Sequence, residues 1–495
     1  MPPMSVLRAP ARYLPVDSCC LLLAGFLLYA AGLAVVVSFH EPAQDEADAW
    51  LAARDLPLSQ IINFARHVGS PALWYLILMP FAKAGVTYAS MLWVHYAIAL
   101  AAAAALLALA PFPIKTRLLA VFSYYLAYQF AAIPRNYSLL ALGLFLTAAS
   151  YASRGDRPIR FALTIFFLAS TSPFGTIFAF SVAVFFTIEI IRQHRRDRHA
   201  LIALLILLLA GALAAVQLWP PRDAQLAGGP LIKYPEFFLD TLTRAFFIPF
   251  GSDLTNFLWL ILNLVLLLAA IFHLARTPFI LATFFLGLAA LFYIFICKWC
   301  VPARHAGVIF LWLLFALWIS QAEITRMMST DDEDQRMFNL LFPLLHAALF
   351  AACIQTVIAW DAEIRVQYSH ARQAAAVICA KGWDRDPIAA PFNAEAILPY
   401  LRCREFYNLN LERFASYNPW NAQYNNNARL MNEQAWQRID RARAQFPTIR
   451  VIWTWPLPDP QSHNLTLLYK TLGDPSPTSE NFYIYGPITS AASTP

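Results

Sequence analysis

Long apolar runs alternate with short polar loops over the first 358 residues of the chain. Such runs predict membrane-spanning helices, because about 20 helical residues cross the hydrocarbon core of a bilayer. The apolar runs cover residues 18–38, 71–86, 88–110, 117–133, 138–153, 161–172, 174–191, 200–219, 255–275, 278–297, 306–320 and 337–358. The pattern predicts an all-α polytopic membrane bundle. Its first run is too long for the apolar part of a cleaved secretory signal, so we interpret it as a retained span.

The composition supports a membrane protein and excludes an ordinary soluble one. Hydrophobic residues make up 59% of the 495 residues, charged residues only 13%, and the mean hydropathy is +0.52. Soluble domains carry about 25% charged residues, because water must solvate their surface. The net charge of +6 is concentrated in loops beside apolar runs. This arrangement favours membrane lipids as partners and not nucleic acid, which would require a basic stripe with interleaved aromatic residues.

The distribution of positive charge predicts the topology, because Lys and Arg are enriched in cytoplasmic loops. The loops predicted on the cytoplasmic side contain Lys115, Arg117, Arg154, Arg157, Arg160, Arg192, Arg195, Arg196, Arg198 and Arg276. If the N-terminus is also cytoplasmic, one early run must fail to cross the membrane. The run 71–86 is short and contains Pro80 and Lys83, so we expect it to lie in the interface. The chain then has about eleven spans.

Polar residues become frequent after residue 358, and helix-like and strand-like patterns alternate there. Helices are expected at 368–381, 394–401 and 428–446, and strands at 387–391, 406–409, 448–454 and 481–485. We therefore predict a transmembrane domain over residues 1–358 and an extracytoplasmic soluble α/β domain over residues 359–495. The expected location is a bacterial inner membrane, with the N-terminus in the cytoplasm and the tail in the periplasm. Cys379 and Cys403 can form a disulfide in an exported tail if they meet.

Four carboxylates follow the first span within eight residues, at Glu41, Asp45, Glu46 and Asp48. Charged groups at a lipid boundary carry a desolvation cost and are often functional. The alternative is a solvated helix start at which Glu41 or Asp45 caps the first turn.

These residues and three later segments resemble the GT-C superfamily of polyprenyl-phosphate-sugar glycosyltransferases. Protein O-mannosyltransferases and lipid A aminoarabinose transferases have Asp-Glu after the first span and a Lys/His-Pro-Pro-Leu element at the start of the next helix. Here Asp45-Glu46 is followed by Gly69-Ser70-Pro71-Ala72-Leu73, in which Ser70 replaces the first proline and Ala72 precedes Leu73. The segment 133–140 is similar to the Arg-x-x-Leu-Leu-Asp turn of the mannosyltransferases but lacks the closing Asp. The segment 298–307 resembles a basic turn that binds the lipid phosphate.

The resemblance implies a metal-independent transferase that moves a sugar from a polyprenyl-phosphate donor to a glycan, lipid or protein acceptor at the extracytoplasmic face. It needs no cofactor besides the lipid-linked donor. Inverting transfer needs one base to accept the proton of the acceptor, and the leaving phosphate needs positive groups. Asp45 is predicted as the base, with Glu46 orienting the acceptor. The residues assigned to the donor phosphate, the sugar or the acceptor are Arg54, His67, Arg135, Tyr137, Lys298, Arg304 and His305.

Four of these residues also have a structural interpretation. Arg135 can snorkel at a helix end, Lys298 and Arg304 can anchor the interface, and His67 can be structural.

Two other functions also fit the chain. An O-antigen ligase or polymerase is the competing enzyme, although such enzymes place a large outer loop with arginines in mid-chain. A membrane transporter or an envelope-assembly scaffold is the competitor without enzymatic activity. It would be favoured if the carboxylates faced an aqueous path across the bundle.

Overall fold

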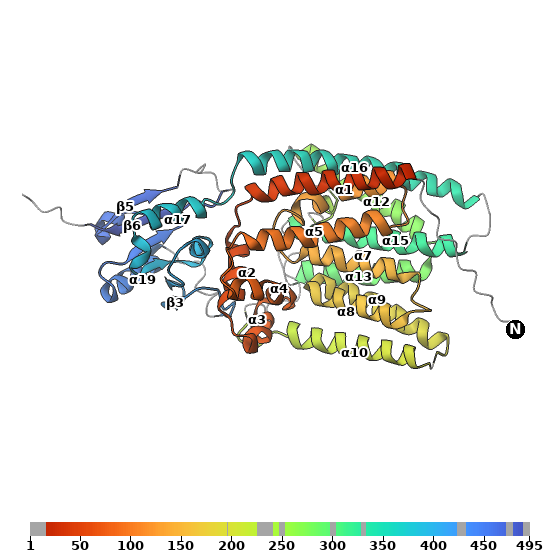
Figure 1. Cartoon of the computed structure of the whole chain (residues 1–495), viewed down its shortest axis with the longest axis horizontal. Coiled ribbons are helices and arrows are strands. Elements are labelled where there is room, and N and C mark those ends of the chain that lie inside the picture. The colour runs from red at the N-terminus through yellow and green to blue at the C-terminus, as the bar shows by residue number, and fades with distance from the viewer. Residues whose placement is uncertain are drawn as a thin grey trace, which may run out of the picture.

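The computed structural model describes residues 16–195, 197–224, 241–246, 253–297, 303–327, 333–422, 432–471 and 479–488. These residues form a long bundle of helices with a small sheet domain at one end (Figure 1). The fold class predicted from the sequence is therefore confirmed.

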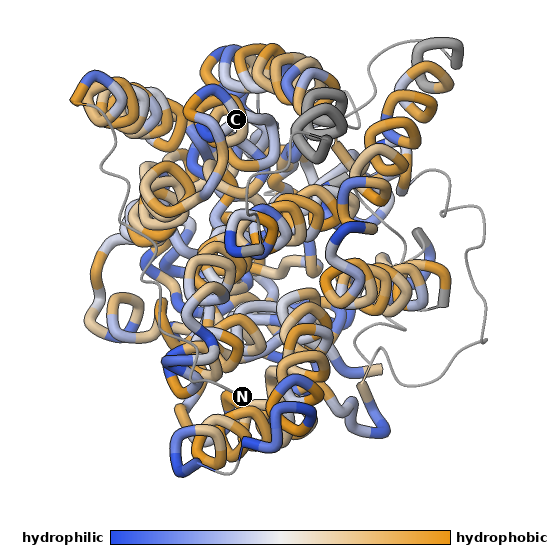
Figure 2. The backbone as a smooth tube through the Cα atoms, turned by 90° about the vertical axis from the view of Figure 1, so that its right-hand side faces the viewer, coloured by the Kyte–Doolittle hydropathy of each residue, from blue (hydrophilic) through white to orange (hydrophobic). Residues whose placement is uncertain are grey.

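Eight helices of the described residues are long and apolar enough to cross a membrane. They are α1 (Val16–Phe39), α5 (Ser90–Leu109), α9 (Pro173–Arg192), α10 (Arg198–Leu218), α12 (Asp253–Leu274), α13 (Pro278–Cys297), α15 (Val308–Met327) and α16 (Glu333–Arg365). Figure 2 looks along the bundle, and apolar residues predominate along its helices.

The start of α9 is determined by residues at its N-terminus. The Ser172 hydroxyl accepts the Gly175 N–H at 2.9 Å, and Pro173 occupies the first turn of α9, where a missing N–H has no cost.

The other apolar runs form shorter helices. The run 138–153 becomes α7 (Tyr137–Tyr151) and the run 161–172 becomes α8 (Pro158–Thr171), whereas the run 117–133 is divided between α6 (Ile114–Val121) and a π-helical turn, η2 (Tyr125–Gln129). The run 71–86 forms α4 (Leu73–Lys83), which has 11 residues. At about 1.5 Å per residue, α4 covers roughly half of the hydrocarbon thickness. The helix is therefore shorter than a membrane span, and the interfacial location of this run stays a prediction.

The sheet domain follows α16. Its six strands have the order β3-β2-β1-β4-β6-β5, and β1 is parallel to both of its neighbours. The strands are β1 (Ile388–Ala390), β2 (Phe406–Asn408), β3 (Arg413–Ala415), β4 (Arg450–Trp453), β5 (Leu465–Lys470) and β6 (Tyr483–Pro487). The helical elements are α17 (Ala371–Ala380), η3 (Trp383–Arg385), η4 (Phe392–Tyr400), α19 (Asn432–Gln445) and η5 (Pro460–His463). All four expected strands are present, and β3 and β5 are additional. Cys379 and Cys403 are free cysteines in the structure.

Two apolar clusters cover the two faces of this sheet. Ala389 and Val451 pack with Ile439 of α19 on one face. On the other face, the cluster around Ile388 and Ile452 continues without interruption into the helices that follow the first span. These are α2 (Gln44–Asp55), η1 (Leu58–Gln60), α3 (Ile61–Val68) and α4. Helix α2, which carries most of the acidic cluster, is therefore packed between the bundle and the sheet domain.

Candidate active site

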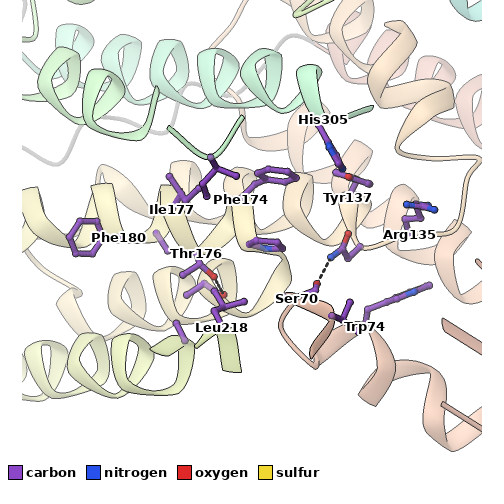
Figure 3. A pocket seen from close by; sticks show the side chains of 18 of the residues that line it. Ser70, Trp74, Arg135, Tyr137, Phe174, Thr176, Ile177, Phe180, Leu218 and His305 are labelled. Carbon is purple, nitrogen blue, oxygen red and sulfur yellow. Dashed lines mark hydrogen bonds between the residues drawn. The ribbon is translucent and has the colours of Figure 1, made fainter. Parts of the chain in front are cut away.

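A cavity of about 820 Å³ lies where α2, the α3–α4 turn, the segment 134–137 and α14 (Ala303–Ala306) meet the membrane helices α8, α9, α10 and α13. One end of the cavity is polar and the other is apolar. The polar residues that line it include Asp45, Asp48, His67, Ser70, Arg135, Asn136, Tyr137, Arg304 and His305. In Figure 3, Arg135, Tyr137 and His305 lie at one end and Phe180 lies at the other. The cavity therefore has the polarity of an amphiphile with a small polar head.

Asp45 forms ion pairs with two arginines from distant parts of the sequence. Arg135 donates to its Oδ2, and the Arg304 Nη2 lies 3.3 Å from the same oxygen. Burial alone would raise the pKa of Asp45, but Arg135 and Arg304 more than offset burial and hold this pKa below its usual value. The carboxylate is therefore ionised at neutral pH. The Asp45 side chain remains 40% exposed, so a proton donor can approach it.

Aromatic packing positions the two arginines. The Tyr137 ring stacks on Phe130 with 4.9 Å between the ring centroids, and it faces Phe174 at 6.3 Å. The His305 ring lies 5.3 Å from that of Phe174. Arg135 precedes this stack in the chain, and Arg304 adjoins it. The buried Nε of Arg304 has no hydrogen-bond partner among the described residues. Arg304 thus retains one N–H donor beyond its contact with Asp45.

Gly307 allows the segment with Arg304 to approach the bundle closely. A Cβ atom at this position would overlap the ring of Tyr125 in the π-helical turn. Gly69 has a different function, because its φ of 70° ends α3 in the left-handed conformation, which glycine adopts without steric cost. The chain then turns into Ser70, whose hydroxyl accepts the Asn136 side-chain amide at 3.2 Å (Figure 3). Gly307 therefore allows one loop to pack on the bundle, and Gly69 turns the chain so that Ser70 reaches Asn136.

Glu46 does not line the cavity. Its carboxylate accepts the Ala43 N–H at 2.5 Å and contacts His40 Nε2 at 3.3 Å. His40 in turn contacts Glu363 of α16 at 2.8 Å. Burial disfavours the charged imidazole, but the two carboxylates outweigh it and raise the pKa of His40 to about 10. Glu46 therefore caps α2 and joins it to the bundle. The alternative interpretation, in which Glu41 or Asp45 provides this cap, is wrong.

Three other residues predicted for the site differ in their positions relative to the cavity. Arg54 is not among the residues that line the cavity; it pairs with Asp55 at 2.7 Å and donates to the Arg404 carbonyl at 2.7 Å, which joins α2 to the sheet domain. His67 lines the cavity and contacts the Asn63 carbonyl at 2.8 Å. Lys298 lies outside the described residues.

Sequence reasoning left Asp48 and Trp420 without a role. Asp48 is only 4% exposed and accepts hydrogen bonds from the Asn418 N–H and the Trp420 indole N–H, both at 2.9 Å. Burial raises the pKa of Asp48 to about 6. Its spacing of three residues from Asp45 places both carboxylates on one helix face. This spacing is visible in the sequence and indicates that Asp48 accompanies Asp45. Trp420 reaches the cavity from the sheet domain, and no local pattern indicates that it does.

The apolar end is walled by small side chains. On α10 these are Ala210, Gly211, Ala214 and Ala215. Their spacing places them on one face of the helix, so they leave a groove along it.

In the part of the chain that the structure describes, no group of three or more His, Cys, Asp or Glu residues is arranged to hold a metal ion.

Comparison with known proteins supports the fold. No protein-family model and no curated protein matches the sequence. The structure is similar to the crystal structure of ArnT from Cupriavidus metallidurans bound to undecaprenyl phosphate, with a TM-score of 0.51 and 11% sequence identity over 97% of this chain and 100% of that chain. ArnT is a lipid A aminoarabinose transferase of the GT-C class. The resemblance seen in the sequence is thus confirmed at the level of the fold, and this chain has a GT-C-like fold.

Proposed function

We propose that this protein is an integral membrane glycosyltransferase that moves a sugar from a polyprenyl-phosphate donor to an acceptor at the extracytoplasmic face. One observation carries the proposal. A single cavity joins two arginines at its polar end to an apolar groove between membrane helices. A polyprenyl phosphate has the same two parts, namely a compact anion and a long apolar isoprenoid chain.

The groove suits the lipid part of such a donor. Ile177 and Phe180 of α9 line the cavity together with the small residues of α10, and Ile294 of α13 adds to the same apolar lining. A Cβ atom added at Gly211 would meet nothing within 4 Å, so space remains beside the α10 backbone. An isoprenoid chain would replace lipid or water there and gain dispersion contacts along its length. The solved structure of ArnT was obtained with undecaprenyl phosphate, which supports this choice of lipid.

The polar end suits the phosphate. Arginine binds phosphate through paired N–H donors, and such charge-assisted bonds are roughly twice as strong as neutral ones. Arg135 and Arg304 already converge on one carboxylate oxygen, so an anionic oxygen fits between them. Negative charge grows on the phosphate as the glycosyl bond breaks, and fixed cations in a partly dry site stabilise that charge.

Asp45 is the proposed general base. It is ionised and lies between the two arginines at the polar end. An acceptor hydroxyl would lose its proton to this carboxylate as its oxygen forms a bond to the anomeric carbon, and the phosphate would leave from the opposite side. Direct displacement with inversion requires one base and no second carboxylate as nucleophile. The concentration of Lys and Arg in the loops at the other end of the membrane helices supports an extracytoplasmic position for this chemistry.

A substitution in the groove tests the lipid donor. Gly211→Leu would project a side chain into the groove without a steric clash in the protein. Gly155→Leu is the matched control, because a Cβ atom at Gly155 also meets nothing within 4 Å and Gly155 does not line the cavity. Binding of undecaprenyl phosphate to purified protein in nanodiscs should weaken severalfold in Gly211→Leu and stay unchanged in Gly155→Leu. Equal binding by both variants, or no binding by the parent protein, would contradict the proposal.

A further inference from the structure

The polar end of the cavity extends beyond the two arginines toward the sheet domain. Asp48 lies one helical turn after Asp45, and Trp420 stands against Asp48. Residues three apart on a helix have Cβ atoms about 5–6 Å apart. Asp48 and Trp420 are therefore adjacent to the proposed phosphate position. Their distance from it is roughly that of a group bonded to the phosphate. Neither Asp48 nor Trp420 is needed to bind the phosphate or the lipid chain.

Trp420 is held firmly in the cavity wall. Its φ is 53°, a left-handed conformation that is uncommon for a bulky residue and persists only where its surroundings enforce it. The surroundings are visible in the structure. The indole N–H donates to Asp48, and the ring edge meets Phe392 with 6.0 Å between the ring centroids. The next residue, Asn421, forms a bridge with Ala224, which follows α10. The sheet domain thus contributes one aromatic ring to the lining of the cavity.

An aromatic face beside a buried carboxylate is suited to a sugar ring. The C–H groups of a pyranose pack on an aromatic face, while its hydroxyls donate hydrogen bonds to carboxylate oxygens. Each Asp48 oxygen accepts one protein hydrogen bond and retains further acceptor capacity. A buried carboxylate would also repel a sugar that carries its own carboxylate.

We propose that Trp420 and Asp48 form a saccharide subsite that binds the glycosyl group of the lipid-linked donor and selects against acidic sugars. The inference rests on the proposed function, because it assumes that the arginines bind the donor phosphate. It makes the sheet domain part of the substrate site: the bundle holds the lipid and the phosphate, and the sheet domain supplies the surface for the sugar.

The test compares a sugar-free ligand with glycosylated ligands. Undecaprenyl phosphate is the sugar-free probe, and undecaprenyl phosphate that carries mannose, glucose or 4-amino-arabinose is the test ligand. The variants are Trp420→Ala and Trp420→Phe. The control is Trp455→Ala, because Trp455 is 42% exposed in the sheet domain and does not line the cavity. Binding of the sugar-free probe also reports whether each variant is folded.

The parent protein should bind at least one glycosylated lipid more tightly than undecaprenyl phosphate. Trp420→Ala should lose about tenfold in affinity for that lipid and keep the parent affinity for undecaprenyl phosphate. Trp420→Phe should retain most of the affinity, because it keeps an aromatic face, and Trp455→Ala should retain all of it. Equal losses in Trp420→Ala and Trp420→Phe, or no loss in either, would overturn the subsite. Failure of the parent protein to bind undecaprenyl phosphate would instead refute the proposed function.

Discussion

Replacing Asp45 by Asn should separate two effects of this one carboxylate. Asp45 is the proposed base, and it also neutralises Arg135 and Arg304. Asparagine keeps the shape of the side chain but has no charge and accepts no proton at neutral pH. Phosphate binding should therefore become tighter in Asp45→Asn, while sugar transfer becomes slower.

The gain in phosphate affinity follows from the exposure of the ion-paired side chains, and the loss in transfer rate follows from removal of the general base. The side chains of Asp45, Arg135 and Arg304 are 40%, 20% and 31% exposed, so each ion pair is worth on the order of 1 kcal/mol. Releasing both guanidinium groups should add ~1–2 kcal/mol to phosphate binding, which lowers Kd about 5–30-fold. Loss of the base should lower kcat about 10²–10⁴-fold.

Two assays on protein in nanodiscs measure these effects, namely the Kd for undecaprenyl phosphate and the transfer rate of a radiolabelled sugar. Glu46→Gln is the matched control, because Glu46 caps α2 and lies outside the cavity. It should lower the Tm and change kcat less than Asp45→Asn does. Unchanged turnover in Asp45→Asn would refute its role as base, and weaker phosphate binding would refute the competition between carboxylate and phosphate.

Four further predictions follow from the structure. Arg304→Ala should weaken undecaprenyl phosphate binding about 10–150-fold, because it removes a charge-assisted contact; a Kd measurement checks this. Gly307→Ala should lower the Tm, since its Cβ would overlap a neighbouring aromatic ring. Burial raises the pKa of Glu480 from 4.5 to about 7, so the folded state should lose stability as the pH rises from about 4.5 to about 7. The Tm should therefore fall over this pH range, and it should fall less in Glu480→Gln. The ratio kcat/KM for transfer, which reports the pKa values of the free enzyme, should stay flat from pH 8 to about 5, because the pKa of Asp45 in the free enzyme lies below its ordinary value near 3.9. A decline of kcat/KM below pH 6 would instead favour Asp48 as base.

The sequence predicted the membrane helices because their signal is local. Apolar runs mark the spans directly, and charged loops indicate which segments share a side. The edge strands β3 and β5 were missed for a related reason. Both are partly exposed, and edge strands often lack the continuous apolar pattern that identifies a buried strand.

The site could be predicted only in part. The charge distribution and the family resemblance pointed to Asp45, Arg135 and Arg304, but no sequence pattern shows that both arginines reach one oxygen of Asp45. The capping role of Glu46 was also hidden, because the residue three positions before it is an alanine and not the Ser or Thr of a capping box. Trp420 depends on how the sheet domain packs against α2, which is a long-range contact.

The most direct measurement is an experimental structure of the protein in nanodiscs with undecaprenyl phosphate, determined by cryo-electron microscopy. We expect density for the phosphate within hydrogen-bonding distance of Arg135 and Arg304, with the isoprenoid chain in the groove between α9 and α10. Lipid bound elsewhere, with Asp45 still holding both arginines and the groove without lipid, would contradict the central claim.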